Sequence, residues 1–534
     1  MTPSKQGLSS DLTPDPSSNP TANAASPNRA LTLEDINADF SLVNTAAISP
    51  DSEQTVRFFS GESIPLEMHR VTTVKRLYLI DADERAKAIE GAGYNTFLLD
   101  NRDVFLDMLT DSGVNSMSIF QQAAMQAADD AYAGSATFYR LKNALDYVFG
   151  KEYFLPAHQG RACENIIAQS FVQPGTAVIT NYHFTTTKAH ILANGGSVIE
   201  VVPETSYDPS FEAPFKGDMD LDLLAAETER VGTENIAFVR IEAGTNLIGG
   251  QPVSLANMRA ISKFCKERGL LLVFDASLLA DNLYFIKTRE EAEHGKTIHE
   301  IVKEIAGLMD IIYFSARKLG CARGGGIVTS DLALHEKMQP LVPLYEGFLT
   351  YGGMSVREME AIAIGLLETC DFHVISQTPI FVEALVNLLE AKGVPCVKPA
   401  GGLGAHLDAM RFVDHIPQEE YPAGALCAAV YLASGIRNME RGTLSEERNP
   451  DGTEHLSNME LVRMAVPKRA FTLSQLHVIA DRIGWLYEHR KLIGGLKFTD
   501  EPEQLRFFFG RLKPTSDWAE KLLAAFKKDM PSGV

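Results

Sequence analysis

The sequence has few cysteines and no long apolar run. Only six of its 534 residues are cysteines, and none belongs to a Cys-x-x-Cys pair or lies near a histidine at metal-ligand spacing. This distribution argues against a disulfide framework and fits a reducing compartment. No uninterrupted apolar run reaches the ~20 residues that span a membrane, and the N-terminus carries no basic-then-apolar signal sequence. We therefore expect a cytoplasmic protein.

Positive charge is also scarce. Lysine and arginine together number 49 against 69 aspartates and glutamates, which gives a formal net charge of -20. A surface this acidic repels phosphate backbones and anionic lipid, so nucleic-acid and membrane-surface roles are disfavoured. A small molecule or another protein is the expected partner. Apolar residues make up 45% of the chain, which predicts a large buried core.

Composition and patterning divide the chain into four regions. Residues 1–58 are rich in Ser, Pro, Asn and Thr, and we expect a disordered tail because they cannot bury enough apolar surface to offset the entropy of ordering. Residues 59–105 are expected to pack with a smaller domain. Residues 106–372 alternate short apolar runs with amphipathic segments, which predicts a large α/β domain. Residues 373–534 are expected to form the smaller α/β domain.

The large region contains six apolar runs that predict strands and two amphipathic segments that predict helices. Continuous rather than alternating hydrophobicity in Leu270–Phe274 indicates a strand covered on both faces of a parallel or mixed sheet. The smaller region predicts helices near 377–393 and 468–489 and strands near 394–398 and 405–409. The predicted elements of the large region are the strands Ala177–Thr180, Ser197–Val202, Ile236–Ile241, Leu270–Phe274, Ile311–Phe314 and Gly326–Thr329 and the helices Leu255–Arg268 and Ile298–Leu308.

An aspartate and a lysine follow two of the predicted strands. Asp275 comes directly after Leu270–Phe274, and Lys318 comes soon after Ile311–Phe314. Functional groups collect at the carboxyl ends of strands in open α/β sheets. A pyridoxal phosphate (PLP) site needs a carboxylate that keeps the pyridine nitrogen protonated and a lysine that forms an imine. The pattern alone leaves open a capping aspartate and a loop lysine that form salt bridges.

Two segments near residues 160 and 184 could also bind a cofactor. Gly160 and Arg161 precede the helical stretch Cys163–Phe171. Glycine lets the backbone approach an anion, helix N-terminal amides point at it, and arginine adds charge, so a phosphate site is predicted there. A plain strand-to-helix turn fits this motif equally well. Phe184 could stack on a cofactor ring, while the threonines that follow it cap a helix or contact a ligand.

A series of segments from about residue 62 to about 512 resembles the aromatic β-eliminating lyases, the family of tyrosine phenol-lyase and tryptophanase. The resemblance implies fold type I of the PLP-dependent transferases, with a large mixed-sheet domain and a smaller C-terminal α/β domain. It also implies a PLP cofactor and a homotetramer built as a dimer of dimers whose shared interface completes each active site. The segments are Gly93–Leu99, Leu109–Gly113, Ala131–Ser135, His158–Arg161, Phe184–Thr187, Asn246–Ser254, Tyr345–Gly347, Tyr351–Gly353, Met439–Gly442 and Gln504–Phe508.

The resemblance implies a role for each matching position. Lys318 resembles the Schiff-base lysine, Asp275 the partner of the pyridine nitrogen, and Tyr132 the tyrosine that protonates the leaving carbon. Arg463 resembles the clamp for the substrate carboxylate, and a potassium-like cation is expected near Gly113 and Asp130. The remaining cofactor positions are Gly160, Arg161, Glu164, Phe184, Asn246 and Ser315, and the substrate positions are Phe97, Thr110, Ser112, Thr185, Met439, Arg441, Arg463, Phe507 and Phe508.

Thr185 and Arg441 resemble the pair that holds the phenolic hydroxyl in the phenol-lyase branch. A buried phenolate oxygen needs a hydroxyl and a cation, whereas indole needs neither. The resemblance therefore implies a carbon–carbon lyase that converts tyrosine or a tyrosine-like amino acid into a phenol, pyruvate and ammonia.

Three leucines depart from the family pattern. Leu278, Leu319 and Leu403 stand where the family has arginine, aspartate and histidine. They keep open a related PLP enzyme with changed chemistry, such as β-replacement, transamination or action on another amino acid. A protein that keeps the fold only to bind a ligand is disfavoured by the intact Lys318 and Asp275.

Overall fold

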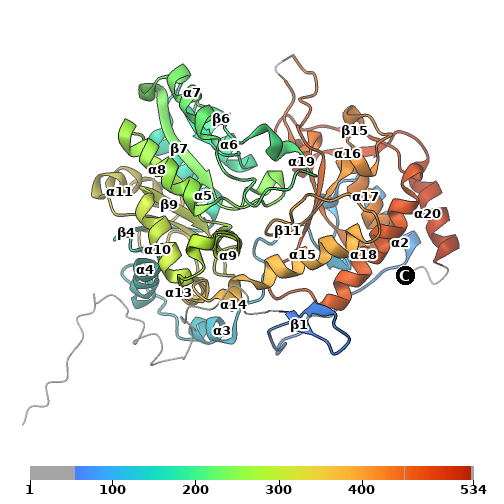
Figure 1. The fold of residues 1–534 in the computed structure, drawn as a ribbon, viewed down its shortest axis with the longest axis horizontal. Helices are drawn as coiled ribbons and strands as arrows, with labels where there is room; N and C mark the ends of the chain where they lie inside the picture. Colours follow the sequence, from blue (N-terminus) through green and yellow to red (C-terminus); the bar gives the residue numbers. More distant parts are fainter. Residues whose placement is uncertain (1–54, 450, 531–534) are drawn as a thin grey trace, which may run out of the picture.

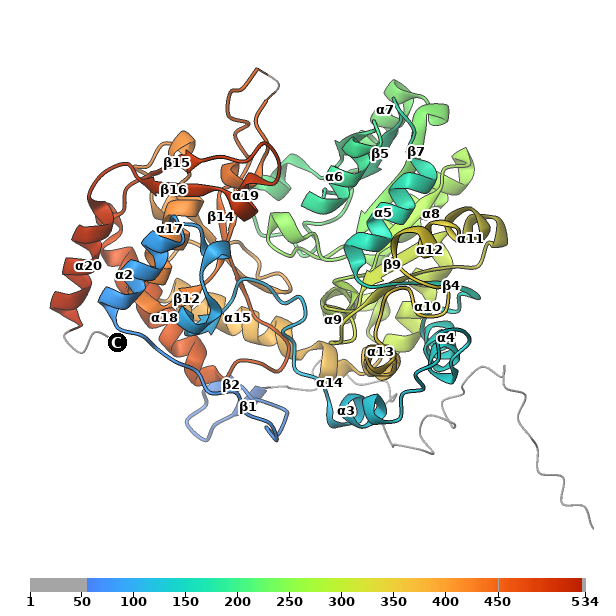
Figure 2. The same ribbon diagram turned by 180° about the vertical axis from the view of Figure 1, so that it is seen from behind.

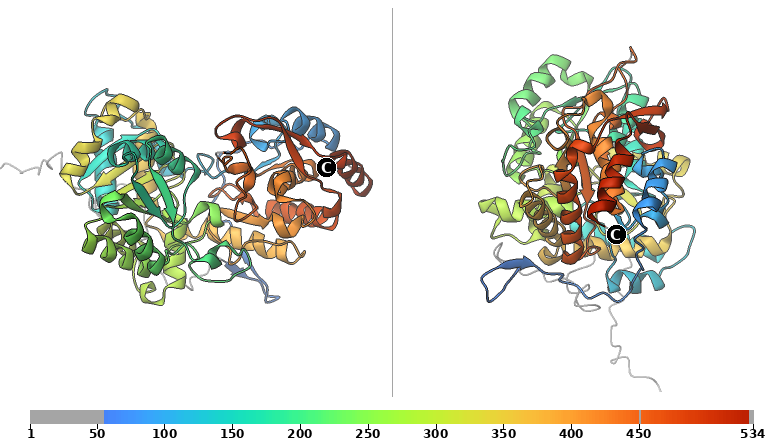
Figure 3. Two further views of the ribbon diagram at one scale, coloured as in Figure 1. Left: turned by 90° about the horizontal axis from the view of Figure 1, so that it is seen from above. Right: turned by 90° about the vertical axis from the view of Figure 1, so that its right-hand side faces the viewer.

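The structure, a computed structural model, describes residues 55–449 and 451–530. Most of the predicted tail lies outside these residues. At its end the structure differs from the prediction, because strand β1 (Thr55–Arg57) pairs antiparallel with strand β2 (Ser63–Pro65). The described chain forms two units, each with its own hydrophobic core. Figure 3 shows the two units side by side from above.

A seven-stranded sheet forms the centre of the large unit. Its strands are β4 (Tyr153–Ala157), β5 (Ala177–Thr180), β6 (Ser197–Glu200), β7 (Ile236–Glu242), β8 (Leu272–Asp275), β9 (Ile311–Ser315) and β10 (Gly325–Thr329). Their order is β4-β10-β9-β8-β7-β5-β6. Strands β5 to β9 pair in parallel, and β10 runs antiparallel to both β9 and β4. The six predicted strands are all present, and the additional strand β4 contains Pro156, which an edge position tolerates.

Both faces of this sheet are buried. In β8, Leu272 and Phe274 belong to one apolar cluster, whereas Val273 belongs to another. This division explains the continuous hydrophobicity of the strand, because side chains alternate between the faces. Figures 1 and 2 show helices on either side. They are α4 (Ala136–Phe149), α5 (Gly160–Phe171), α6 (Thr185–Ala193), α7 (Leu221–Val231), α8 (Leu255–Arg268), α9 (Leu279–Arg289), α10 (Ile298–Leu308), α11 (Leu332–Met338), α12 (Leu341–Tyr345) and α13 (Val356–Glu368).

Helices α8 and α10 have the predicted bounds because local signals define their ends. The Ser254 hydroxyl accepts a hydrogen bond from the backbone of α8 at its N-terminus, and Gly269 ends the helix with a φ of 66°. Thr297 and Glu300 form a capping box at the start of α10. Capping side chains of this kind satisfy amides that have no partner inside the helix.

The smaller unit combines residues from both ends of the described chain. Its main sheet has the order β11-β14-β13, and helix α2 packs beside α17 and α20 (Figure 2). The N-terminal segment thus contributes to the core of this unit, and so do Leu106 and Met108, which fall within the range 106–372 expected for the large domain. The elements are α2 (Ala82–Gly91), β3 (Leu106–Asp107), α15 (Gln377–Glu390), β11 (Gly404–Asp408), α16 (Ala409–Phe412), α17 (Pro422–Ser434), β12 (Ile436–Arg437), β13 (Met439–Arg441), β14 (Leu461–Ala465), α18 (Leu473–Glu488), β15 (Leu496–Asp500), α19 (Arg506–Phe509), β16 (Arg511–Pro514) and α20 (Trp518–Asp529).

Two predictions for this unit differ in detail. The strand expected near 394–398 is reduced to an isolated bridge between Cys396 and Leu407. The helix expected from 468 begins at Leu473, because Thr472 forms a capping box there. Two further helices, α3 (Ile119–Gln126) and α14 (Phe372–Ile375), lie near the junction of the units (Figure 2). Within the described chain, the segment Phe372–Glu390 alone has the length and hydropathy of a membrane span, and 56% of that window is buried inside the fold.

Candidate active site

A cavity of about 370 Å³ is lined by residues from both units. In the large unit it lies at the carboxyl ends of β7, β8 and β9, where functional groups are expected. Every residue predicted to bind cofactor or substrate lines it, although these positions are spread over more than 400 residues of sequence. They are Phe97, Thr110, Ser112, Gly160, Arg161, Glu164, Phe184, Thr185, Asn246, Asp275, Ser315, Lys318, Met439, Arg441, Arg463, Phe507 and Phe508.

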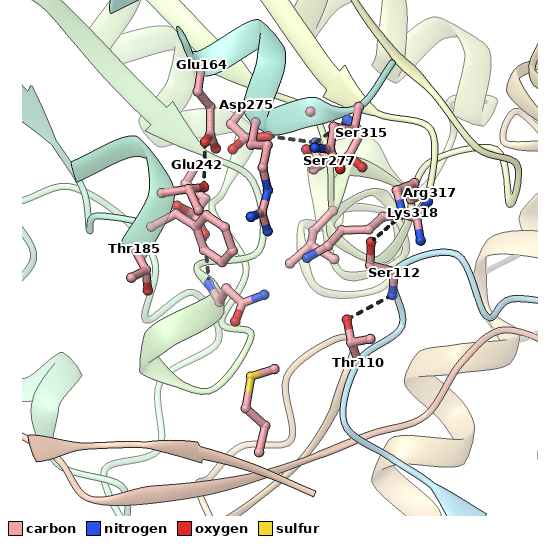
Figure 4. A pocket seen from close by; sticks show the side chains of 18 of the residues that line it. Thr110, Ser112, Glu164, Thr185, Glu242, Asp275, Ser277, Ser315, Arg317 and Lys318 are labelled. Carbon is pink, nitrogen blue, oxygen red and sulfur yellow. Dashed lines mark hydrogen bonds between the residues drawn. The ribbon is translucent and has the colours of Figure 1, made fainter. Parts of the chain in front are cut away.

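Lys318 extends into the middle of the cavity. Its side chain lies between Thr110 and Ser112 on one side and Glu242 and Thr185 on the other (Figure 4). The Nζ atom is 5.5 Å from the centre of the Phe184 ring. It is also 3.7 Å from Oδ1 of Asp111, a buried carboxylate oxygen without a hydrogen-bond partner among the described residues. The amine therefore lies at the wall of the cavity, and the Asp111 carboxylate is close enough to balance its positive charge.

The N-terminus of α5 provides an anion site. This helix begins at Gly160, and the Gln159 side chain makes no capping hydrogen bond there. A Cβ atom on Gly160 would lie 2.8 Å from Cβ of Ser315, so only glycine allows this close approach. Uncapped amides, the Ser315 hydroxyl and the nearby Arg161 guanidinium are suited to a phosphate group.

Asp275 is held by three hydrogen-bond donors. Arg240 Nη2 and Tyr313 Oη donate to Oδ2 at 2.7 and 2.8 Å, and the Ser277 amide donates to Oδ1 at 2.9 Å. Arg240 is 1% exposed and also donates to Glu242 Oε2. Arg240, Glu242 and Tyr313 were not predicted as site residues, because each lies inside an apolar strand pattern that gives no functional signal.

Glu164 connects the cavity to the start of α6. Its two carboxylate oxygens accept hydrogen bonds from the hydroxyls of Thr186 and Thr187 at 2.5 and 2.8 Å. Burial raises the pKa of Glu164, and the nearby Asp275 adds to this effect. Two of the threonines after Phe184 therefore serve to hold this glutamate, while Thr185 lines the cavity.

Two arginines of the smaller unit face the cavity. Arg463 donates from Nη1 to Asn246 Oδ1 and from Nη2 to the Leu109 carbonyl, both at 2.8 Å. Arg441 is 7% exposed, and its Nε and Nη1 atoms have no hydrogen-bond partner within residues 55–449 and 451–530. Burial, and then the charge of Arg463, lower the pKa of Arg441 to about 9. A buried guanidinium with unused donors is suited to an anionic or strongly polar ligand atom.

The predicted acid Tyr132 and the predicted cation site are not brought into this cavity. Tyr132 is 71% exposed, stacks on Phe348 and lines a separate pocket together with Asp130. Gly113 packs against Arg317, whose Cζ atom would lie 2.8 Å from a Cβ atom at Gly113. The described residues contain no metal-binding group of three or more His, Cys, Asp or Glu side chains. The role of Tyr132 and the cation therefore stay predictions.

Two of the three departures from the family pattern converge. Leu278 and Leu403 form one small apolar cluster with Ala465, and Leu278 lines the cavity. Leu319 is 1% exposed and belongs to the core of the large unit. Of the three leucines, Leu278 therefore contacts the cavity directly, and Leu403, which is 1% exposed, can act on a bound ligand only through Leu278.

Comparison with known proteins decides the family. The profile described as Beta-eliminating lyase matches residues 107–482. The tyrosine phenol-lyase of Fusobacterium nucleatum is 42% identical over 84% of this chain and 98% of its own length. The chain belongs to the β-eliminating lyase family. The tyrosine phenol-lyase of Pasteurella multocida is 40% identical to this lyase over 84% of the chain and 99% of its own length.

Solved structures show the fold of the lyase. The putative kynurenine aminotransferase Bna3p from Saccharomyces cerevisiae matches with a TM-score of 0.55 at 14% identity, covering 76% of this chain and 95% of its own. A serine palmitoyltransferase from Sphingomonas wittichii matches with a TM-score of 0.51 at 13% identity, covering 72% and 88%. The predicted fold, fold type I of the PLP-dependent transferases, is confirmed. Family membership also confirms a PLP-dependent β-eliminating lyase of the tyrosine phenol-lyase kind.

Proposed function

We propose that this lyase cleaves tyrosine, or an amino acid with the same 4-hydroxyphenyl side chain, at the bond between Cβ and the ring. With tyrosine and one water molecule the products are phenol, pyruvate and ammonium. The bond to the ring carbon breaks, a proton replaces Cβ on that carbon, and water enters the three-carbon fragment as ammonium leaves.

The unused donors of Arg441 carry this proposal. They lie in a cavity whose wall includes the rings of Phe97, Phe507 and Phe508, and the Arg441 guanidinium is 5.9 Å from the centre of the Phe507 ring. The Phe97 ring is 5.6 Å from Phe507 and 4.9 Å from Phe508. An aromatic ring with one oxygen fits this combination, because the ring buries apolar surface while the oxygen satisfies a cation that is otherwise desolvated.

The cavity also fits the cofactor that family membership implies. Lys318 would hold PLP covalently, Gly160, Arg161 and Ser315 would bind its phosphate, and Asp275 would face its ring nitrogen. Phe184 would pack against the ring. When bound, PLP supplies an electron-withdrawing ring that stabilises negative charge at the substrate Cα.

The residues of the chain would then position the substrate and move its protons. Arg463 binds the substrate carboxylate, and Arg441 with Thr185 binds the phenolic oxygen. The Lys318 amine takes the proton from Cα, and the Asp111 carboxylate at 3.7 Å stabilises the resulting ammonium. The phenylalanines exclude water from the ring, which strengthens each of these polar contacts.

Leu278, which lines the cavity and packs against Leu403, favours a second candidate, a β-replacement, transamination or elimination on another amino acid. An apolar wall at this place lowers the polarity around the ring contacts of a ligand and removes hydrogen-bond donors. Product identity distinguishes the two candidates, because tyrosine cleavage alone releases phenol.

The test is to incubate PLP-loaded protein with tyrosine and to quantify phenol and pyruvate. We expect equal amounts of both, and a Lys318→Ala variant should lose the visible absorption band and the products. Asp111→Asn should keep the band and reduce turnover. Band formation with pyruvate or another keto acid but no phenol would support the second candidate and overturn the first.

We also propose a homotetramer and a bound monovalent cation, as the resemblance implies. Tyr132 supports the assembly. Its ring is exposed and lies outside the cavity of its own chain, so as the predicted acid it would have to reach the substrate in the cavity of a neighbouring chain. Mass by light scattering tests the tetramer. Turnover in sodium compared with potassium buffer tests the cation, and equal rates would contradict it.

A further inference from the structure

Arg240 is a buried cation at the base of the active site. Its side chain is 1% exposed and lies between the acidic side chains of its own strand β7 and of β8. It donates to Glu242 Oε2 at 3.0 Å and to Asp275 Oδ2 at 2.7 Å. Its Nε donates to the Tyr313 hydroxyl, which itself donates to the same oxygen of Asp275. One guanidinium is thus shared between two carboxylates.

Counting lone pairs shows which oxygen of Asp275 remains available. Oδ2 accepts from Arg240 and Tyr313, so both of its lone pairs are used. Oδ1 accepts only the Ser277 amide among these contacts, and one lone pair stays open. Asp275 lines the cavity, so this lone pair can accept a hydrogen bond from a ligand N–H group.

Glu242 is the second carboxylate that binds the Arg240 guanidinium. Its Oε1 accepts the Asn246 amide and its Oε2 accepts Arg240, and the residue is 4% exposed and lines the cavity. Burial raises the pKa of Glu242 although Arg240 acts against this effect, and the Asp275 charge raises it further. Burial lowers the pKa of Arg240, but Tyr313, Glu242 and Asp275 outweigh it and the pKa lies above its ordinary value.

We propose that Arg240 and Glu242 are a matched pair of positioning residues that sets how much negative charge Asp275 presents to the cofactor ring nitrogen. This inference rests on the proposed role of Asp275. Arg240 orients the Asp275 carboxylate and neutralises part of its negative charge. Glu242 limits this neutralisation because it binds the same guanidinium. The two side chains therefore act on the ring nitrogen in opposite directions.

Other titratable groups also surround Asp275. Glu164 of α5 acts on Asp275 and on Arg240, and Tyr313 of β9 is in direct contact with both. Cys163 of α5 lies close enough for Asp275 to raise its pKa, although burial is the main cause. These groups are common to all the variants below, so a difference between variants reports on Arg240 and Glu242.

Two single substitutions and their combination test the pair. Arg240→Met removes the positive charge beside Asp275, so the full negative charge of this carboxylate acts on the ring nitrogen. The nitrogen should then release its proton about one pH unit higher than in the wild type. In Glu242→Gln the whole guanidinium acts on Asp275, so the release should occur about one unit lower. The double variant lacks one positive and one negative charge. Its ring nitrogen should therefore titrate closer to the wild-type pH than that of either single variant.

The measurement is nitrogen NMR of the holoenzyme loaded with PLP that is labelled at the ring nitrogen, recorded against pH. The visible absorption band confirms loading, and the thermal midpoint reports folding. Arg240→Lys serves as the matched variant, because it keeps the charge and should titrate near the wild type even if Arg240→Met fails to fold.

The outcomes separate this inference from the proposed function. In one outcome the wild type binds PLP and releases phenol, but the ring nitrogen titrates at the same pH in both single variants or shifts in the same direction in both. This outcome would overturn the matched pair and leave the proposed function standing. A wild type without a PLP band would overturn both. Variants with altered thermal midpoints and unchanged nitrogen titration would show that the pair only stabilises the fold.

Discussion

Arg441 and Arg463 lie on the neighbouring strands β13 and β14, yet their hydrogen bonding differs. Arg463 is fixed by Asn246 and by the Leu109 carbonyl, which leaves its Nε atom without a partner in the described chain. Arg441 has two such atoms. His406 lies behind them, and burial, followed by the charge of Arg463, lowers its pKa to about 3, so it is neutral and adds no third charge. Arg441 is therefore the arginine with more hydrogen-bonding capacity left for the proposed phenolic oxygen.

Arg441→Met should reduce kcat/KM for tyrosine by about 100-fold, because a hydrogen bond to a charged group contributes about 1.5–3 kcal/mol. Elimination from 3-chloroalanine, which has a β-leaving group and no phenolic oxygen, should change less than about threefold. Steady-state kinetics with both substrates measures the ratio. Equal losses on the two substrates would contradict a contact with the phenolic oxygen.

Helix α5 and its neighbours position the phosphate site and the cofactor ring. The helix starts at Gly160, packs against Ser315 of β9, and carries Glu164 one turn later. The end of β8 places Asp275 beside this start because β8 and β9 pair in parallel. The strand ends and the helix start thus converge through sheet topology, which no local pattern records.

Gly160→Ala should weaken PLP binding at least tenfold, because the new Cβ atom would lie 2.8 Å from Ser315 Cβ and displace the helix start. Titration of apoprotein with PLP, followed by the visible band, gives the affinity. Gly307→Ala in α10, where a Cβ atom meets nothing within 4 Å, is the control and should leave it unchanged. Equal affinities for wild type and Gly160→Ala would show that the phosphate binds elsewhere.

The N-terminus of α8 carries a pH-dependent contact. Asp218 accepts hydrogen bonds from the amide and hydroxyl of Ser254, and burial raises its pKa to about 7. Since the native state holds the proton more tightly than the unfolded chain, this contribution to stability is complete below about pH 4 and is lost as pH rises to 7.

Asp218→Asn should therefore gain stability relative to the wild type as pH rises from 5 to 8. The expected gain in thermal midpoint is a few degrees, and scanning calorimetry at both pH values measures it. A difference between the two proteins that stays constant with pH would show that Asp218 does not titrate in this range.

Tyr132, one of the predicted catalytic residues, lies on the surface of the chain. Tyr132 contacts Phe348 and Tyr351, at ring-centre distances of 5.4 and 5.5 Å, and lies outside the cavity that contains Lys318. A long exposed segment, including Phe59, Val71 and Val74, also leaves apolar side chains uncovered. The proposed assembly would bring Tyr132 to the cavity of another chain.

Coexpressing Lys318→Ala with Tyr132→Phe tests this sharing. Each variant alone should be inactive, whereas a mixed pair has one site with an intact lysine and an intact tyrosine. Random pairing should restore about a quarter of the wild-type phenol release per chain. No recovery in a verified mixture would show that Tyr132 does not act in a neighbouring chain.

Much of the fold could be predicted from the sequence because its signals are local. Apolar runs mark the strands β5 to β10, and capping residues end α8 and α10. The motifs between residues 62 and 512, taken in order, predicted the family, the cofactor and the positions that line the cavity. Such motifs are readable because a reaction constrains residue type at fixed positions in the chain.

Only the tertiary structure decided which charges meet. Arg240 and Glu242 resemble ordinary strand residues in the sequence, and become part of the site because β7 and β8 end together. Asp111 lies in a matching motif, but only folding brings its carboxylate to within 3.7 Å of Lys318 Nζ. Leu278 and Leu403 are 125 positions apart in the chain and form one cluster only after folding. The reason is physical: burial and through-space distance determine electrostatic interactions, and the sequence specifies neither until the chain is packed.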